Sequence, residues 1–185
     1  MREKRGAIEL SVGTIVIVVL AMSMLILGLV LIRTIFKGAT NVADLSSEQI
    51  ISEVNKLFGE DKKVVIYPAI DTIVVKSGET RGFGIVIRNQ LSGAQAKLTN
   101  FSYEVVPVSD VEKDCGVTKE EVYNLFASGS EKDMNIPVAT GDPKAIKVLF
   151  ETGEGDPICT IRFRVDVKAN GENYDYDYVF VKFTG

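Results

Sequence analysis

The apolar residues of this chain are concentrated near its amino terminus. Residues 12–32 form a run without a single charged side chain. At a rise of about 1.5 Å per residue, a helix of this length matches the ~30 Å hydrocarbon core of a bilayer. We therefore expect residues 7–37 to form one hydrophobic helix that crosses a membrane.

A second helical pattern follows in residues 46–58, where five apolar residues fall on one face: Ile50, Ile51, Val54, Leu57 and Phe58. Ser46 and Gln49 have the spacing of a capping box, and Gly59 is placed to end the helix. Within residues 38–60, this helix is expected either to extend the membrane helix as a stalk or to fold back on the next domain as a lid. A position on the membrane surface is disfavoured because Lys56 is its only basic residue.

Beyond residue 60 the apolar period shortens to two, which is typical of strands. The segments with this pattern are 64–67, 72–76, 80–89, 97–106, 145–150, 161–168 and 174–183. Thr118 and Glu121 form a second capping box ahead of Val122, Leu125 and Phe126 at helical spacing, which predicts a short helical insertion. Asn170-Gly171 predicts a chain reversal, and its separation from Tyr174 indicates a loop longer than two residues.

Several short strands at spacings near ten residues predict an antiparallel β-sandwich of immunoglobulin-like type in residues 61–185. The expected fold class is therefore α+β, a long hydrophobic helix followed by an all-β sandwich with a helical insertion. The stretch from Lys76-Ser77-Gly78-Glu79 to Asn89 also resembles a passage of adhesion-type immunoglobulin-like modules found on archaeal and bacterial surfaces.

Composition narrows the function classes. The chain has no histidine, which excludes imidazole bases, histidine-dependent triads and histidine-ligated zinc, and it lacks common nucleophile and nucleotide-binding motifs. Residues 1–37 hold five of the 21 basic and two of the 25 acidic residues, so the remainder carries a formal charge of −7. A domain this acidic is poorly suited to nucleic acid. We expect no enzymatic activity, no cofactor, no metal site and no nucleic-acid partner.

Three smaller features of the predicted domain suggest a covalent bond, a modification or an ion site. Cys115 and Cys159 suggest one disulfide in an extracytoplasmic domain, with two buried free thiols as the alternative. Asn100-Phe101-Ser102 is a glycosylation sequon, which makes Asn100 a candidate for modification. Asp175 and Asp177 could suit calcium but fit a solvated strand face better, because two carboxylates alone do not form a cage.

The residues just before the hydrophobic run are distinctive. Lys4-Arg5-Gly6-Ala7 places a basic pair and a glycine against its start, and Val12-Gly13-Thr14 opens the run itself. This arrangement resembles the class III signal peptides of archaeal type IV pilins and archaellins, which a prepilin peptidase cuts on the cytoplasmic side. The resemblance implies a leader of residues 1–6, recognised through Lys4 and Arg5 and cut between Gly6 and Ala7.

The same resemblance implies a subunit of a cell-surface filament, whose partners are copies of itself, the peptidase and, before assembly, membrane lipid. Small residues that would let such helices approach closely are Gly13, Ala21, Ser23 and Gly28. Glu9 would be the third residue after the cut, whereas bacterial pilins carry a glutamate at the fifth. The expected orientation puts the amino terminus in the cytoplasm and the sandwich outside. The alternative is a single-pass membrane protein with an immunoglobulin-like binding module, such as a stator-like or cell-envelope-contacting protein, that does not polymerise.

Overall fold

A computed structural model describes residues 3–38, 41–58, 62–93 and 99–185; within the first helix it describes the side chains of residues 13–31 only. The chain divides into two compact units, Met1–Thr40 and Asn41–Gly185. The first unit is helical and the second is rich in strands, so the protein is of mixed α+β class.

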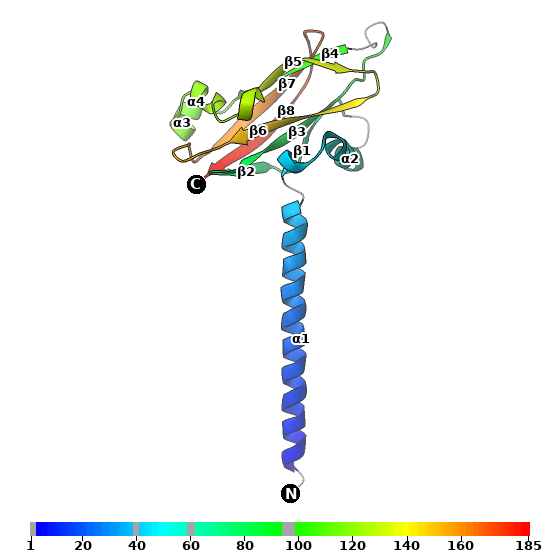
Figure 1. Cartoon of the computed structure of the whole chain (residues 1–185), viewed down its shortest axis with the longest axis vertical. Coiled ribbons are helices and arrows are strands. Elements are labelled where there is room, and N and C mark those ends of the chain that lie inside the picture. The colour runs from blue at the N-terminus through cyan, green and yellow to red at the C-terminus, as the bar shows by residue number, and fades with distance from the viewer. Residues whose placement is uncertain (1–2, 39–40, 59–61, 94–98) are drawn as a thin grey trace. The chain divides into compact units, whose positions relative to one another are not determined.

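The first unit contains one helix, α1 (Glu3–Gly38), of 36 residues (Figure 1). Its central part, Gly13–Leu31, is long and apolar enough to cross a membrane. Because apolar residues occupy every face of Gly13–Leu31, this stretch has no polar side that would keep it in water.

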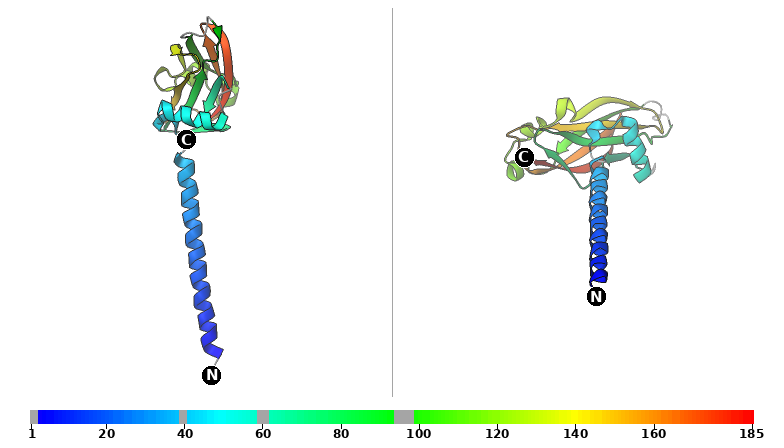
Figure 2. Two further views of the ribbon diagram at one scale, coloured as in Figure 1. Left: turned by 90° about the vertical axis from the view of Figure 1, so that its right-hand side faces the viewer. Right: turned by 60° about the horizontal axis from the view of Figure 1, so that its bottom comes forward.

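The second unit contains two sheets (Figures 1 and 2). The three-stranded sheet has the order β1–β3–β6, with bounds β1 Val64–Tyr67, β3 Thr80–Arg88 and β6 Pro143–Glu151. The five-stranded sheet has the order β2–β8–β7–β4–β5, with bounds β2 Thr72–Lys76, β8 Glu172–Thr184, β7 Thr160–Ala169, β4 Thr99–Pro107 and β5 Lys132–Val138.

The inner faces of the two sheets share one hydrophobic core. Alternate residues of β7 point into it, since Ile161, Phe163 and Val165 are fully buried while Arg162 faces solvent. Five phenylalanines at its centre are also almost completely buried: Phe83, Phe101, Phe150, Phe163 and Phe183. The period-two pattern in the sequence therefore corresponds to an inner and an outer face, as expected for strands covered on one side.

The outer face of the three-stranded sheet is covered by the short helix η1 (Val42–Asp44) and by α2 (Ser47–Phe58). Ile50 and Val54 of α2 are fully buried, and they pack against outward-facing strand residues that include Val65 and Val86. α2 therefore packs on the sheet of its own unit, which is what the lid arrangement requires. Leu57 of the predicted stripe stays 59% exposed, and the side chain of Phe58 and the whole of Gly59 lie outside the described residues.

Reciprocal hydrogen bonds fix the start of α2. The Ser46 amide donates to Gln49 Oε1 at 2.8 Å, and the Gln49 amide donates to Ser46 Oγ at 3.2 Å. This is the capping box predicted from the sequence, and it satisfies amides that the helix itself leaves unpaired.

The insertion between β4 and β5 is helical, as predicted, but it contains more than one helix. Its elements are α3 (Val111–Cys115), α4 (Lys119–Tyr123) and the turn η3 (Ala127–Gly129). Thr118 and Glu121 form the expected capping box at the start of α4. Val122 and Phe126 are buried in the common core, so the insertion closes one end of the space between the sheets.

The last hairpin differs from the expectation of a long loop. β7 ends at Ala169 and β8 begins at Glu172, so Asn170 and Gly171 alone form the turn, with φ of 50° and 87°. Positive φ at both positions is what a tight type I′ hairpin turn requires. The pairing register of β7 and β8 shifts between Val167 and Lys168. This irregularity in the ladder, and not a longer loop, accommodates the residues between the turn and Tyr174.

Two further features of the sheets were not foreseen. β5 was not predicted as a strand at all, and β2 pairs with β8 in parallel, from Thr72 opposite Phe180 to Lys76 opposite Thr184. The remaining strand pairs are antiparallel in the part of the chain that the structure describes. The expected purely antiparallel arrangement therefore needs this correction.

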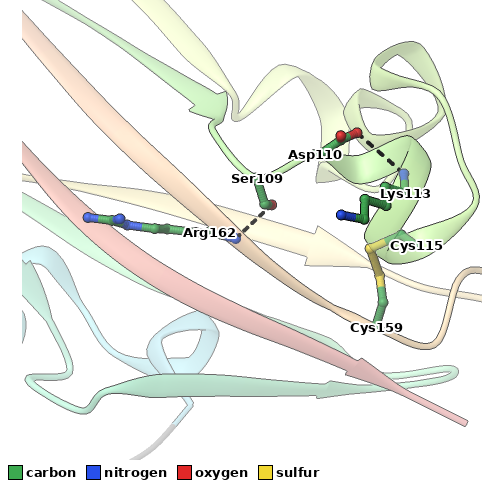
Figure 3. Close-up of a disulfide and its surroundings, with 6 residues drawn as sticks. All are labelled: Ser109, Asp110, Lys113, Cys115, Cys159 and Arg162. Atoms are coloured by element: carbon green, nitrogen blue, oxygen red, sulfur yellow. Dashed lines mark hydrogen bonds between the residues drawn. A yellow bond between two sulfur atoms is a disulfide. The ribbon is translucent and has the colours of Figure 1, made fainter.

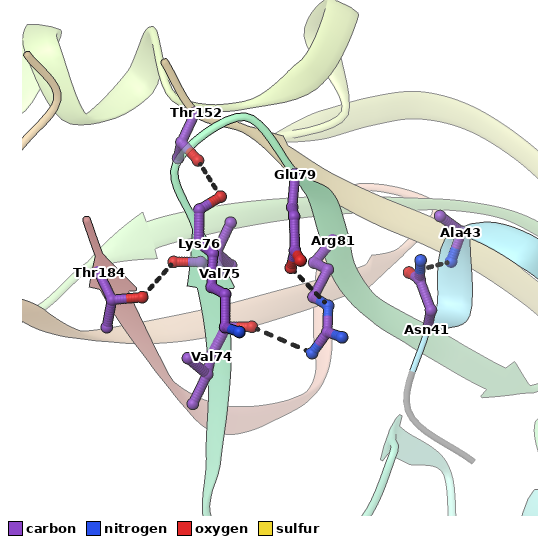
Figure 4. A network of polar contacts seen from close by, with 9 residues as sticks. All are labelled: Asn41, Ala43, Val74, Val75, Lys76, Glu79, Arg81, Thr152 and Thr184. Atoms are coloured by element: carbon purple, nitrogen blue, oxygen red, sulfur yellow. Dashed lines mark hydrogen bonds and ion pairs between the residues drawn. The ribbon is translucent and has the colours of Figure 1, made fainter. Parts of the chain in front are cut away.

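The turn predicted at Lys76-Ser77-Gly78-Glu79 joins the ends of several strands (Figure 4). Gly78 adopts φ +78°, and its amide donates to the Thr152 carbonyl at 2.8 Å. Thr152 Oγ1 in return donates to the Lys76 carbonyl at 2.9 Å. These bonds tie the end of β2 to the residue that follows β6. In this protein, the start of the stretch from Lys76 to Asn89 therefore has the structural role of joining strand ends.

Candidate functional site

The apolar helix is the first candidate site. Every residue of Gly13–Leu31 is exposed within its own unit, and Leu25 and Leu27, for example, are 64% and 67% exposed. A Cβ atom added at Gly13 or Gly28 would meet no atom within 4 Å. Apolar area on this scale requires lipid or other helices around it.

The leader residues lie within the backbone of the same helix. Lys4, Arg5, Gly6, Ala7 and Glu9 all belong to α1, and their side chains are outside the described residues. Recognition and cutting of a leader therefore remain predictions of the sequence.

The two cysteines form a disulfide with a Cα–Cα distance of 5.4 Å (Figure 3). Cys115 is the last residue of α3, and Cys159 immediately precedes β7. The bond closes a loop across 44 positions and holds the insertion against the five-stranded sheet. The prediction of a disulfide, in place of free thiols, is confirmed.

A tyrosine joins the two sheets at the opposite end of the unit. The Tyr174 hydroxyl of β8 donates to the Arg88 carbonyl of β3 at 2.6 Å and accepts from the Gln90 amide at 3.0 Å. Its ring packs edge-on against Phe101 at 5.0 Å between centroids. Burial raises the pKa of this phenol above its ordinary value. Tyr174 is therefore a structural residue rather than a reactive one.

Tyr103 makes a second link near the insertion. Its hydroxyl donates to the Ser130 carbonyl at 3.0 Å, and Ser130 Oγ in turn donates to the Leu149 carbonyl of β6 at 2.9 Å. Burial, with smaller contributions from Asp133 and Glu131, raises the pKa of Tyr103 to about 12. The neutral phenol is thus favoured in the folded protein.

This shift predicts a loss of stability at alkaline pH. An unfolded tyrosine releases its proton near pH 10, whereas folded Tyr103 keeps it until about pH 12. Between these values the unfolded state binds fewer protons, so the free energy of unfolding should fall as pH rises, and be unaffected by this group below about pH 10. Urea unfolding followed by circular dichroism should show a shallower fall for Tyr103→Phe. An identical pH slope in that variant would contradict the assignment.

The outer face of the five-stranded sheet presents exposed aromatic rings in a row along β8. Tyr176, Tyr178 and Phe180 are 59%, 38% and 42% exposed. The Arg162 guanidinium of β7 lies 4.0 Å from the centre of the Tyr178 ring and 5.7 Å from that of Phe180. We refer to Tyr176, Tyr178 and Phe180 as the aromatic row.

Beside the aromatic row the same face is hollowed into two shallow grooves. One, of ≈ 680 Å³, is lined by residues that include Arg164, Asp166 and Tyr176. The other, of ≈ 540 Å³, lies between the row and the insertion and includes Ser109, Asp114 and Arg162. The Arg164 guanidinium and the Asp166 carboxylate form an ion pair with an N–O distance of 2.9 Å.

Sequence reasoning missed this surface. The alternation in β7 assigned Arg162 and Arg164 to the solvent face, and that much was correct. What the sequence alone could not give was the register, which puts Arg162 opposite Phe180 and Arg164 opposite Tyr178. The sequence feature that could have revealed this surface is the placement of three aromatic residues at alternate positions on the polar face of the last strand.

Asp175 and Asp177 bind backbone amides of their own strand. Asp175 Oδ1 accepts from the Tyr176 amide at 2.9 Å, and Asp177 Oδ1 accepts from the Tyr178 amide at 2.8 Å. β2 pairs with β8 only from Phe180 onward, so these amides lie on a stretch of β8 edge that β2 does not cover. Among the described residues, no group of three or more potential metal ligands comes together.

The glycosylation candidate Asn100 lies near the start of β4 and is exposed. Its carbonyl accepts from the Asn170 amide at 2.9 Å, and its own amide donates to Asn170 Oδ1 at 3.3 Å. These bonds engage the backbone, and modification of the Asn100 side chain remains a prediction.

Comparisons with known proteins give no family for this chain. No family model matches it, and no curated protein does. Among solved structures, an alkylpurine DNA glycosylase, AlkC, from Pseudomonas fluorescens bound to DNA with an abasic site analog is 14% identical, with a TM-score of 0.36 over 65% of this chain and 30% of that one. The periplasmic chaperone SfaE is 8% identical, with a TM-score of 0.38 over 65% of this chain and 56% of that one. The chain thus spans less than two thirds of either protein, and likenesses this low carry no argument about fold or function.

Proposed function

We propose that this chain is a structural subunit of a cell-surface filament of the archaeal type IV pilus or archaellum kind. The observation that carries the proposal is α1, a helix of 36 residues in a chain that also holds a separate disulfide-bonded unit. Its apolar stretch, Gly13–Leu31, is exposed at every residue within its own unit. Such a helix is stable in lipid before assembly and among copies of itself afterwards.

The sequence at the start of α1 supports the proposal. Lys4-Arg5-Gly6-Ala7 resembles a class III signal peptide, so a prepilin peptidase would remove residues 1–6 and leave Ala7 as the new amino terminus. The remaining helix would stay in the membrane, with its amino terminus toward the cytoplasm, until assembly. Gly13, Ala21 and Gly28 would then allow close approach of neighbouring helices in the filament core.

The β-rich unit would be displayed outside the cell as an immunoglobulin-like sandwich. Its two sheets enclose one core made of alternating inward-facing residues, which agrees with that architecture. The disulfide suits an oxidising, extracytoplasmic environment. The acidic balance of this unit keeps the displayed surface soluble.

Mass spectrometry of the amino terminus tests the proposal. Surface filaments sheared from cells that express the chain should contain it beginning at Ala7, and membranes of cells lacking the peptidase should contain it from Met1. Gly6→Val should block both cutting and assembly. Gly28→Val is the matched control for cutting, because an added Cβ there meets no atom within 4 Å and the site is far from the leader.

Two outcomes would count against the filament. A chain found only in membranes and intact from Met1 would favour the alternative of an anchored module that does not polymerise. Cutting of the Gly6→Val variant at the same rate as the unaltered chain would show that the resemblance of the leader is accidental.

A further inference from the structure

The outer face of the five-stranded sheet has the composition of a protein contact surface. The rings of Tyr176 and Tyr178 stand at 80° to each other, and the Arg162 guanidinium covers the face of Tyr178 at 4.0 Å. These rings therefore present edges and a cation, and not a series of free faces for a flat ligand. Exposed tyrosine and arginine together are enriched where one protein binds another. The composition thus favours a protein partner for this face.

Basic side chains surround the aromatic row. They occupy outward positions of β2, β7 and β8 and are Lys76, Arg162, Arg164, Lys168 and Lys182. These three strands are described throughout, and the acidic side chain at their outward positions, Asp166, is already paired with Arg164 at an N–O distance of 2.9 Å. On β4 and β5, Glu104 lies opposite Lys132, so these two charges offset each other. This outer face, which we call the basic face, is thus positively charged in a region of formal charge −7.

The insertion between β4 and β5 carries the opposite charge. Residues 109–131 contain two basic and six acidic residues, so their formal charge is −4. The acidic residues are Asp110, Glu112, Asp114, Glu120, Glu121 and Glu131. Asp114 lines the groove beside Arg162 in the same copy, whereas Glu112 and Glu120 are exposed outside that groove. In the described part of the chain none of the six forms an ion pair, so their charges are available to a partner.

The basic face and the insertion lie at different places on one β-rich unit. The basic face is the outer side of one sheet, and the insertion closes one end of the space between the sheets, where Figure 1 shows α3 and α4. A contact between two different patches repeats from copy to copy and gives an open polymer when its rotation does not close a ring. Such a contact therefore suits a helical filament, whereas a contact between two identical patches gives a closed pair.

We propose that the basic face of one copy binds the acidic insertion of the next copy in the filament. The aromatic row forms the centre of this contact, where packed rings exclude water, and Arg162 and Lys182 pair with insertion carboxylates such as Glu112 and Glu120 at its rim. The inference rests on the proposed function, because packing of α1 brings the copies together. Exposed ion pairs are individually weak, but units attached to packed helices are held at an effective concentration on the order of millimolar, at which a weak contact is occupied.

Charge reversal in cells that assemble the filament tests the contact. Arg162→Glu/Lys182→Glu reverses the basic face, and Glu112→Lys/Glu120→Lys reverses the insertion. Either pair places like charges opposite each other and should lower the yield of sheared filament about tenfold. The chain with all four substitutions has the formal charge of the unaltered chain and should recover most of the yield, because the attraction is restored with the signs exchanged.

A matched control separates the contact from the effect of net charge. Asp142→Lys/Glu154→Lys changes two exposed loop carboxylates outside both patches by the same number of charges as the insertion variant, and it should leave the filament yield unchanged. Every variant should still begin at Ala7, because the leader is the same in all of them.

A zero-length carbodiimide cross-link gives a second measurement that does not depend on any variant. In sheared filaments of the unaltered chain it should join Lys76 or Lys182 of one copy to Glu112 or Glu120 of another. Mass spectrometry of the cross-linked dimers identifies the joined residues. The detergent-dispersed chain, in which α1 does not hold copies together, should give no such dimer.

The outcomes distinguish this contact from the filament itself. Normal filament yield with either patch reversed, failure of the fourfold variant to recover, or cross-links that avoid these residues would each overturn the contact and leave the proposed function standing. An unaltered chain that is not cut, or that is cut and forms no filament, would overturn the proposed function and the contact with it.

Discussion

Phe150→Ala is expected to lower the free energy of unfolding of the β-rich unit by about 3–5 kcal/mol, the usual cost of removing a buried aromatic ring. Phe150 is fully buried in β6 and faces the core between the sheets. Four rings surround it at centroid distances of 4.6–6.1 Å: Phe83, Phe126, Phe163 and Phe183. Because they come from both sheets and from the insertion, the cavity cannot close by moving one element.

Urea unfolding of the detergent-solubilised chain, followed by tyrosine fluorescence, measures this effect. All six tyrosines lie beyond residue 60, so the signal reports on the β-rich unit without interference from α1. The matched control is Phe180→Ala, which removes the same side chain from the outer face, where Phe180 is 42% exposed, and should cost about 0.5 kcal/mol. Equal losses in the two variants would show that Phe150 is not at the centre of the core.

Removing the disulfide is expected to have the next largest effect. Cys115→Ser/Cys159→Ser frees a loop closed across 44 positions, and the chain-entropy model gives a loss of about 3–4 kcal/mol for a loop of this size. The loss should include local loosening of the insertion, because α3 ends at Cys115. Hydrogen exchange should therefore speed up most between Val111 and Tyr123.

A reducing agent provides the control for this second prediction. It should lower the stability of the unaltered chain to nearly that of the double serine variant and leave the variant itself unchanged. If the unaltered chain were equally stable with and without the reducing agent, under conditions that mass spectrometry shows to reduce the bond, the disulfide would contribute nothing to stability.

The features that the sequence predicted well are local ones. The capping boxes at Ser46 and Thr118 involve residues three apart, and the period-two pattern of β7 lies within a single strand. The apolar stretch of α1 is likewise visible as a consecutive run of apolar residues in the sequence. Each of these follows from neighbouring residues, so no knowledge of the fold was needed.

The features that the sequence did not predict depend on partners far along the chain. β5 has four exposed residues in succession and contains Pro137, so its pattern is not that of a strand; it is held as one by pairing with β4. The parallel pairing of β2 with β8 joins segments about a hundred residues apart. The aromatic row was missed for the same reason, since Arg162 reaches Tyr178 only through the β7–β8 register.

The carboxylates of Asp175 and Asp177 protect the uncovered edge of β8, which matters where many copies of the domain are crowded together. An uncovered strand edge invites the strand of another molecule to add to the sheet, and the risk grows as copies are brought together. Here the amides of Tyr176 and Tyr178 are already occupied, and two negative charges stand where an incoming strand would lie. Many copies displayed side by side could therefore touch without fusing their sheets, which would keep the domains individually folded at densities where an open edge would lead to aggregation.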